Sequence, residues 1–406
     1  MMIRMALFTL LAFQVISCQS PSQNNNSIES WRAVLLLNEE NYVALPFTMK
    51  VSGPQESATL TIQNAEEEIK LGPVNLNQDS LIIDLPVFES SMHLKKENEQ
   101  WVGEWIKYQS RAIPLTIYTQ ESQRFTAKEE PKINLSGSWQ LEFSPGTEDF
   151  YPAIGEFKQD EYGHLTGTIL TETGDYRYLE GQVTGNDFAL STFDGAHAFY
   201  FEGSLKGEKL EATFYSGSHW SEPFSGKRTD TPELKSAGEL SYVHDSLPLE
   251  FRFPMPSGDS LFYAQEAFKG QPVLIQILGT WCPNCMDETR VLIQMQKEFP
   301  DLKILGLAFE RSLDTSIAYS NIRKMKSDLQ VSYPIALAGT WSKKEAGKAL
   351  PFLSSVVSYP TLIFIDRNGE VSHVHTGFSG PGTGKHFDKT KEELRNELLK
   401  IYPKGK

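Results

Sequence analysis

Two cysteines three positions apart, Cys282 and Cys285, stand out chemically in this chain of 406 residues. A Cys-x-x-Cys pair can act as a redox dithiol, close a structural disulfide, or supply two zinc ligands. A disulfide across so short a loop constrains little of the unfolded chain and stabilises a fold weakly. A closed zinc site needs four ligands, and the sequence has no second Cys-x-x-Cys motif. The spacing therefore favours a redox dithiol.

The flanking sequence predicts that this pair lies where a buried strand turns into a helix. An apolar run over residues 272–278 precedes the cysteines, and apolar residues recur at helical spacing over 286–299. Pro283 suits the first helical turn, where its missing N–H is not needed. The unpaired N–H groups and the dipole of a helix N-terminus favour the thiolate form of Cys282.

Charge and cysteine content restrict the class of protein. The formal net charge of −14 argues against nucleic acid binding and against basic adhesion to anionic lipid. The length predicts two or three domains. Cys18 is the third and last cysteine, so the long N-terminal half has none available for internal disulfides.

Residues 1–18 are interpreted as a lipoprotein signal peptide. Their apolar core, residues 5–16, is shorter than the about 20 residues that span a bilayer. The segment ending in Ser17-Cys18 resembles a bacterial lipobox, in which the cysteine becomes the lipidated N-terminus. The alternative is a soluble secreted protein with an incidental cysteine. Residues 19–29 are polar and predict a flexible tether.

Two regions predict all-β domains. In residues 30–130, short strand patterns separated by turn residues, among them Gly72-Pro73, indicate a β-sandwich. In residues 134–228, glycines recur every ten to twelve residues between strand-length segments, which indicates an up-and-down antiparallel barrel. Barrels of this kind can hold a small ligand.

Histidines outside the cysteine region are weaker signals. His197, His219 and Trp220 lie in the second β region, and we interpret them as scattered residues rather than a site. His373 and His375 alternate on one face of a predicted exposed edge strand, the spacing of a metal-binding pair. Two histidines alone do not complete a metal site, so we predict no metal there.

The C-terminal part predicts an α/β domain. Residues 229–247 are a polar linker, and strand and helix patterns alternate over residues 248–406. A strand at 361–366 and an antiparallel partner at 370–376 flank a tight turn. An amphipathic helix at 389–401 closes the chain.

Three motifs make this C-terminal domain resemble the TlpA/ResA-like thioredoxin-fold proteins of bacterial envelopes. They are Trp281-Cys282-x-x-Cys285, Glu288 three residues later, and Tyr359-Pro360-Thr361 before an apolar strand. The resemblance covers residues 248–406 and implies a thioredoxin-like fold with thiol–disulfide oxidoreductase activity. The two β regions resemble no family beyond their architecture.

The resemblance also implies roles for single residues. Cys282 is implied as the exposed nucleophile and Cys285 as the buried resolving thiol. Pro360 is implied as a cis-proline whose loop faces the disulfide. Glu288 is implied as a proton relay near Cys285, because an apolar pocket raises the pKa of a carboxyl group. The alternative for Glu288 is an ordinary exposed helical glutamate.

Two sites, three residues in all, depart from thioredoxin itself. The dipeptide between the cysteines is Pro283-Asn284 where thioredoxin has Gly-Pro, and Tyr359 stands before the implied cis-proline where thioredoxin has Thr. Both positions tune the redox potential and the fit of the partner, so they leave the direction of electron flow open.

We therefore predict a multidomain envelope lipoprotein with two N-terminal all-β domains followed by an α/β thioredoxin-like domain. It is predicted to be anchored to the membrane by lipid on Cys18, with the thioredoxin-like domain in the periplasm. The Cys282–Cys285 pair is predicted to reduce disulfides of client proteins and to need an upstream thiol electron donor, but no cofactor.

Two alternatives remain at this stage. In one, the domain handles copper through the two cysteines and a histidine, since soft thiolates suit Cu(I). In the other, the β domains bind a ligand or partner and carry the function, while the thioredoxin-like domain is a passenger.

Overall fold

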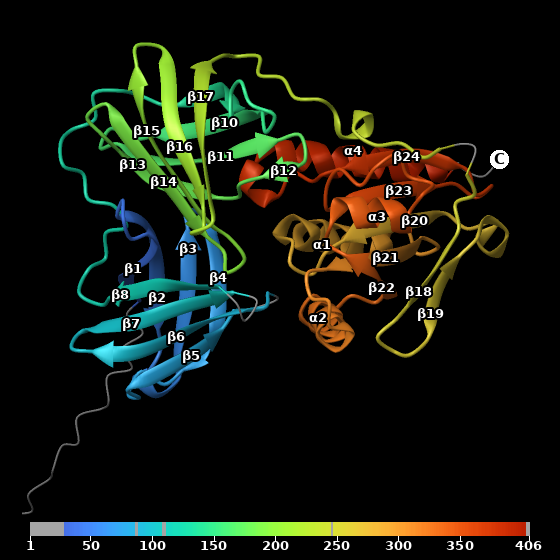
Figure 1. Ribbon diagram of the computed structural model, residues 1–406, viewed down its shortest axis with the longest axis horizontal. Helices are drawn as coiled ribbons and strands as arrows, with labels where there is room; N and C mark the ends of the chain where they lie inside the picture. Colours follow the sequence, from blue (N-terminus) through green and yellow to red (C-terminus); the bar gives the residue numbers. More distant parts are fainter. Residues whose placement is uncertain (1–27, 86–87, 108–110, 245–246, 403–406) are drawn as a thin grey trace, which may run out of the picture.

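The structure is a computed structural model, and it describes residues 28–85, 88–107, 111–244 and 247–402 (Figure 1). The predicted signal peptide, Cys18 and all but the last residues of the tether lie outside these ranges. Among the described residues, no helix is long and apolar enough to cross a membrane. Figure 1 shows a barrel beside an N-terminal sheet, with the thioredoxin-like domain packed alongside.

The first domain is one eight-stranded antiparallel sheet with the order β4-β3-β2-β1-β8-β7-β6-β5. Its strands are β1 (Glu29–Asn38), β2 (Val43–Ser52), β3 (Ala58–Asn64), β4 (Glu67–Val74), β5 (Ser80–Asp84), β6 (Ser90–Glu97), β7 (Gln100–Lys107) and β8 (Arg111–Tyr118). Every second residue of β1 from Trp31 to Leu37 is buried, as expected for a strand with one face on the core.

This sheet bends so that β1–β4 and β5–β8 run in crossing directions (Figure 1), and one apolar core lies between the two halves. The predicted β-sandwich is therefore confirmed only in part: its two layers are halves of a single folded sheet, because β1 and β8 remain paired at the bend. The turn predicted at Gly72-Pro73 is wrong. Pro73 pairs with Thr59 beside a register shift in β4, an edge strand, where a missing N–H is tolerated.

The second domain is a closed antiparallel barrel. Its strands are β9 (Gly137–Phe143), β10 (Tyr151–Gln159), β11 (His164–Thr171), β13 (Leu179–Thr184), β14 (Asp187–Phe193), β15 (Ala198–Lys206), β16 (Lys209–Ser216) and β17 (Trp220–Arg228). Each strand pairs with the next along the chain, β17 returns to β9, and the β10–β11 pairing completes the ring. This is the up-and-down topology. The interior is a packed core of aromatic and aliphatic side chains that includes Trp139, Phe143 and Phe201.

A short ninth strand, β12 (Gly174–Asp175), extends the edge of β11 and points toward the thioredoxin-like domain (Figure 1). We call residues 173–177 the docking segment. After the barrel, the chain forms a short 3-10 helix, η2 (Ala237–Glu239), and Val243 then pairs with Leu353. The chain therefore joins the third domain before residue 248, the predicted boundary.

The third domain has a hairpin and a central sheet with helices packed on it. The elements are β18 (Phe251–Pro254), β19 (Ser260–Tyr263), β20 (Val273–Leu278), α1 (Pro283–Glu298), β21 (Lys303–Glu310), α2 (Thr315–Asp328), β22 (Ile335–Thr340), α3 (Lys343–Ala349), β23 (Thr361–Ile365), β24 (Val371–Thr376) and α4 (Lys385–Ile401). The sheet order is β22-β21-β20-β23-β24. Strands β20, β21 and β22 are parallel to one another, β23 is antiparallel to β20, and β24 is antiparallel to β23. Helix α4 begins at Lys385, four residues before its predicted start.

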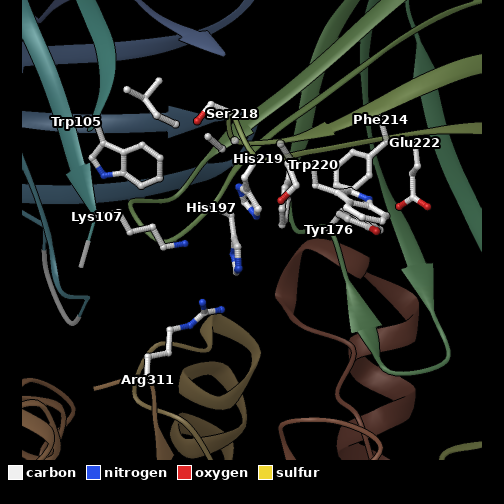
Figure 2. A pocket seen from close by; sticks show the side chains of 15 residues that line it. Trp105, Lys107, Tyr176, His197, Phe214, Ser218, His219, Trp220, Glu222 and Arg311 are labelled. Atoms are coloured by element: carbon white, nitrogen blue, oxygen red, sulfur yellow. The ribbon is translucent and has the colours of Figure 1, made fainter. Parts of the chain in front are cut away.

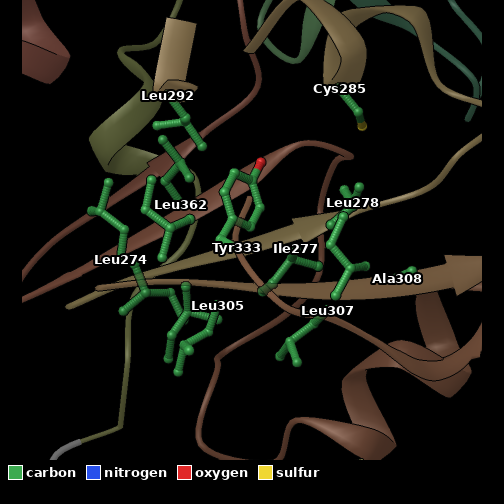
Figure 3. Packing of buried hydrophobic residues seen from close by; sticks show 14 of the residues in the cluster. Leu274, Ile277, Leu278, Cys285, Leu292, Leu305, Leu307, Ala308, Tyr333 and Leu362 are labelled. Carbon is green, nitrogen blue, oxygen red and sulfur yellow. The ribbon is translucent and has the colours of Figure 1, made fainter. Parts of the chain in front are cut away.

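Strand β20 lies at the centre of this sheet, and all six of its residues are buried. Figure 3 shows Leu274, Ile277 and Leu278 in the core, with Leu292 of α1 on one side and Leu305 of β21 nearby. Burial of each such side chain contributes about 1.5–3 kcal/mol. The end of β20 is thus a rigid support for the cysteine-bearing turn that follows it.

Candidate active site

Cys282 and Cys285 form a disulfide where β20 leads into α1, at the predicted junction of strand and helix. Their Cα atoms are 5.2 Å apart. Cys282 is the N-cap of α1, and its Sγ accepts a hydrogen bond of 3.2 Å from the backbone N–H of Cys285. Pro283 occupies the first turn, as predicted. The same N–H donor and the helix dipole stabilise a thiolate on Cys282 when the pair is reduced.

The two sulfurs differ less in exposure than the resemblance implied. Cys285 is fully buried and points into the core (Figure 3), whereas Cys282 is only 5% exposed. The expectation of an exposed nucleophile is therefore corrected. Barrel residues contact Asn284, two residues after Cys282, and Ser358, next to the Tyr359 carbonyl that faces Cys282 Sγ, as described below.

The cis-proline loop faces the disulfide. The peptide bond between Tyr359 and Pro360 is cis, as the resemblance implied. The carbonyl oxygen of Tyr359 lies 3.4 Å from Cys282 Sγ, within reach of a hydrogen bond from the reduced thiol. The Tyr359 ring meets Trp281 edge to face, with 5.5 Å between ring centroids. Tyr359, a departure from thioredoxin, therefore helps to hold the residue that precedes the first cysteine.

Glu288 is fully buried in α1, one helical turn beyond Cys285, so the alternative of an exposed helical glutamate is wrong. Burial raises the pKa of Glu288 to about 8, although a hydrogen bond of 2.9 Å from Gln276 Nε2 to Glu288 Oε2 opposes the shift. The other oxygen, Oε1, is buried without a hydrogen-bond partner among the described residues. Glu288 is thus a carboxyl group that can exchange a proton near neutral pH.

Gln276 is a site residue that sequence reasoning missed. Its side chain donates to Glu288 and to Thr289 Oγ1 (3.1 Å), and accepts from the hydroxyl of Tyr333 (2.8 Å). The available signal was a single amide within the otherwise apolar run of residues 272–278. A polar side chain in a fully buried strand needs hydrogen-bond partners, and here they include the Glu288 carboxyl.

The turn before the cysteines is held by the end of β21. Glu310, buried, accepts hydrogen bonds from the backbone N–H (2.9 Å) and the hydroxyl (2.6 Å) of Thr280. Burial raises the pKa of Glu310. The indole N–H of Trp281 donates to the carbonyl of Phe309 at 2.9 Å, and the Arg311 guanidinium stacks 4.5 Å from the Trp281 ring. These contacts restrict the orientation of the turn that carries Cys282.

The docking segment of the barrel packs directly on this site. Asp175 Oδ2 accepts a hydrogen bond of 3.1 Å from the side chain of Asn284, between the two cysteines. The hydroxyl of Ser358, just before the cis-proline loop, donates to the carbonyl of Thr173 at 3.0 Å. A Cβ on Gly174 would lie 2.7 Å from Asn284 Nδ2, so a larger residue at this position would displace the Asn284 side chain. Asn284 therefore connects the active site to another domain.

Arg177, at the end of the docking segment, contacts all three domains. It forms ion pairs with Asp287 Oδ2 of α1 at 2.8 Å, with Asp194 Oδ2 of the barrel at 3.4 Å, and with Glu67 of β4. The Arg177 side chain is 12% exposed, and those of Asp287 and Asp194 are more buried still. One guanidinium thus links both β domains to the helix of the cysteines, a contact that the sequence pattern did not indicate.

The interpretation of His197, His219 and Trp220 as scattered residues is wrong, because they line one cavity (Figure 2). The β14–β15 connection carries His197, and the β16–β17 turn carries His219. In an up-and-down barrel, these two connections emerge at the same end. Residues of the other two domains complete the lining, as described in the further inference.

The predicted exposure of His373 and His375 is also wrong in part. Strand β24 is an edge strand, but η2 and α4 pack against it, and His375 is 5% exposed. Burial lowers the pKa of His375 to about 4. Among the residues that the structure describes, no group of three or more His, Cys, Asp or Glu could hold a metal ion. The copper-handling alternative therefore has no ligand cluster in this part of the chain.

Comparison with known proteins identifies the class of the third domain. Residues 243–394 match the family model Redoxin, so this part of the chain is a Redoxin domain, in agreement with the TlpA/ResA-like resemblance. The chain is similar to thiol:disulfide interchange protein DsbE of Vibrio cholerae, with 30% identity over 128 residues. This match covers 32% of the chain and 62% of the relative. Thus the chain spans less than two thirds of that protein.

Two further similarities concern the same region. Thiol-disulfide oxidoreductase ResA of Bacillus thuringiensis is 26% identical over 136 residues, covering 34% of this chain and 66% of that protein. A solved structure of a putative thiol:disulfide interchange protein DsbE from Chlorobium tepidum is 19% identical, with a TM-score of 0.30. That match covers 39% of this chain and 99% of the other.

Proposed function

We propose that this protein is an envelope thiol–disulfide oxidoreductase that reduces disulfides of client proteins through Cys282 and Cys285. The carrying observation is the disulfide at the N-terminus of α1, which the cis Tyr359–Pro360 loop faces at 3.4 Å. The match of residues 243–394 to Redoxin and the names of the relatives support the same reaction class.

In the reducing direction, the Cys282 thiolate attacks one sulfur of a client disulfide, and the other client sulfur leaves as a thiolate. The product is a mixed disulfide between Cys282 and the client. Cys285 then attacks the Cys282 sulfur, which releases the second client thiolate. The client gains two electrons, the pair becomes oxidised, and an upstream dithiol must reduce the pair before the next cycle.

Glu288 is proposed to serve the second step. Cys285 is surrounded by apolar side chains, an environment that disfavours its thiolate. The Glu288 carboxyl, one turn away on the same helix face, can accept the thiol proton once it is ionised. Gln276 orients this carboxyl through its 2.9 Å hydrogen bond. We assign Glu288 as the proton relay and Gln276 as a residue that positions it.

Client binding is proposed to require movement of the docking segment. Asp175 contacts Asn284, and Thr173 contacts Ser358, so barrel residues occupy both flanks of Cys282. A protein disulfide has to approach the sulfur along the cis-proline loop. We therefore expect the β domains to influence which clients react, rather than to be inert extensions.

Lipid attachment at Cys18 is proposed to hold the molecule on the membrane, with the redox domain facing the periplasm. Cys18 lies outside the described residues, and the proposal depends on the lipobox-like segment before it. The formal net charge of −14 disfavours electrostatic attachment of the protein to anionic lipid as an alternative to the lipid anchor.

Trapping in cells tests the proposed function. Cys285→Ser leaves Cys282 able to form the mixed disulfide but unable to resolve it. Non-reducing gels followed by mass spectrometry are expected to identify proteins linked to Cys282, and the Cys282→Ser/Cys285→Ser double variant is the control. Absence of any linked protein above that control would contradict client reduction.

A further inference from the structure

A cavity of about 380 Å³ lies where the three domains meet (Figure 2). Strand β7 of the first domain contributes Trp105 and Lys107, the barrel contributes His197 and Trp220, and the thioredoxin-like domain contributes Arg311. This volume lies within the range of about 300–1,000 Å³ that is typical of small-molecule sites. The site exists only when all three domains are assembled.

The barrel side of the cavity is an aromatic surface. Tyr176 of the docking segment packs edge to face on Phe199 and Phe214, with 5.1 and 5.0 Å between ring centroids. Its hydroxyl lies 2.8 Å from that of Tyr151, inside the barrel end. Tyr176 therefore closes the packed barrel core, and the cavity lies outside that core, at the barrel end that carries Trp220.

The charged lining is predominantly cationic. Lys107 and Arg311 are the two basic side chains of the lining, and Figure 2 shows them directed into the same space from two domains. Among the lining residues that the structure describes, Glu222 is the one carboxylate, and it accepts a hydrogen bond of 2.9 Å from Tyr151 and another from Ser144. Glu222 is thus held by barrel hydroxyls. Lys107, which also donates to the carbonyl of Ala196, and Arg311, which stacks on Trp281 and Trp341, both line the cavity.

We propose that this cavity binds a small anionic molecule with an aromatic or apolar body. The anionic group lies between the Lys107 ammonium and the Arg311 guanidinium, and electrostatic attraction to both cationic groups favours it there. The apolar body packs on the Tyr176 and Trp220 side. The net charge of −14 disfavours a polyanion, so a compact ligand with one charged group is the better match. This proposal does not depend on the proposed redox function.

A pair of fluorescent probes tests the proposal with the full chain. 8-Anilino-1-naphthalenesulfonate carries one negative charge, and N-phenyl-1-naphthylamine is its uncharged counterpart. We expect saturable one-site binding of the sulfonate. We expect Lys107→Gln and Arg311→Gln each to weaken it about tenfold, which corresponds to the loss of one charge-assisted contact. The uncharged probe should bind wild type and both variants equally.

Matched controls separate the cavity from general dye adhesion. Lys209→Gln and Arg323→Gln remove exposed charges outside the cavity, and both should leave sulfonate binding unchanged. Trp220→Ala, at the 46% exposed rim, should weaken both probes, and equal thermal midpoints would exclude misfolding. Non-saturable sulfonate binding, or equal sulfonate affinity in the Lys107, Arg311 and control variants, would overturn the proposal. Equal affinity of the two probes for wild type would show that the site does not select an anion.

Discussion

Arg177 of the barrel forms a 2.8 Å ion pair with Asp287, which lies two residues beyond Cys285 in the active-site helix. The same guanidinium reaches Glu67 in the first domain. The position of both β domains is therefore coupled electrostatically to the first turns of α1. The surroundings of the proposed redox site therefore depend on all three domains, although its reacting atoms belong to one domain.

Replacing Arg177 is expected to loosen the docking segment. Arg177→Gln leaves three buried carboxylates without their shared cation, a loss of about 3–5 kcal/mol in comparable buried pairs. In a Cys285→Ser background, we expect iodoacetamide to label Cys282 about tenfold faster or more, because 1.4 kcal/mol corresponds to one factor of ten. Arg228→Gln is the control, since the contacts that the structure describes for Arg228 lie within the barrel: the carbonyls of Asn134 and Ser136 and the ring of Trp139. Equal rates in both variants would mean that docking does not limit access.

The two thiols of the reduced protein are expected to differ in reactivity. Cys282 has the helix N-terminal position and small but finite exposure, whereas Cys285 is fully buried. Alkylation at mildly acidic pH should therefore label Cys282 at least about tenfold faster than Cys285. Peptide mass spectrometry at successive times measures both rates. Similar rates in the folded protein would contradict the assignment of nucleophile and resolving thiol.

Glu288→Gln is expected to slow resolution of the mixed disulfide. The amide keeps the shape and can still accept the Gln276 hydrogen bond, but it cannot take the Cys285 proton. We expect a loss on the order of 10²-fold or somewhat less in resolution, with a smaller change in the attack by Cys282. Rapid mixing with a model disulfide separates the two steps. If resolution is unchanged across neutral pH, Glu288 has no relay role.

The same residue predicts a pH dependence of stability. The pKa of Glu288 rises from 4.5 to about 8 on folding, so between these values the folded protein binds more protons than the unfolded chain. Glu288 therefore leaves the free energy of unfolding at its full value below pH 4.5, where the carboxyl is protonated in both states. This free energy falls as the pH rises from 4.5 toward 8. Relative to Glu288→Gln, wild type should lose about 1.4 kcal/mol of unfolding free energy for each pH unit. Denaturant unfolding of both proteins from pH 5 to 8 measures this difference, and parallel profiles would contradict the raised pKa.

Cys18→Ala is expected to release the protein from the membrane fraction without loss of disulfide reductase activity in vitro. Cys18 is the single cysteine outside the Cys-x-x-Cys motif, and the lipobox-like segment precedes it. Fractionation of cells followed by immunoblotting checks the location, and purified variant protein checks the activity. Retention of the variant in the membrane fraction would point to another anchor.

Local sequence patterns were sufficient to predict the redox motif and the strand and helix that flank it. The apolar run that became β20, the helix that begins at Pro283 and the Cys282–Cys285 pair are all defined within about 30 residues of one another. The barrel topology could be read in the same way, because glycine-punctuated strands pair with their sequence neighbours. In contrast, the pairing of β1 with β8 joins residues more than 70 positions apart, so the single folded sheet was not visible locally.

The amino-acid sequence by itself determined the chemistry of this protein: two thiols at a strand–helix junction and a carboxyl group one turn later. Tertiary structure alone decided the environment of those groups, because burial and charge pairing depend on which distant segments meet. It placed Gln276 against Glu288, Arg177 between three carboxylates, and Lys107 opposite Arg311 across one cavity. No periodicity or spacing encodes such contacts, since each joins side chains from separate elements whose approach is set by the packing of whole domains.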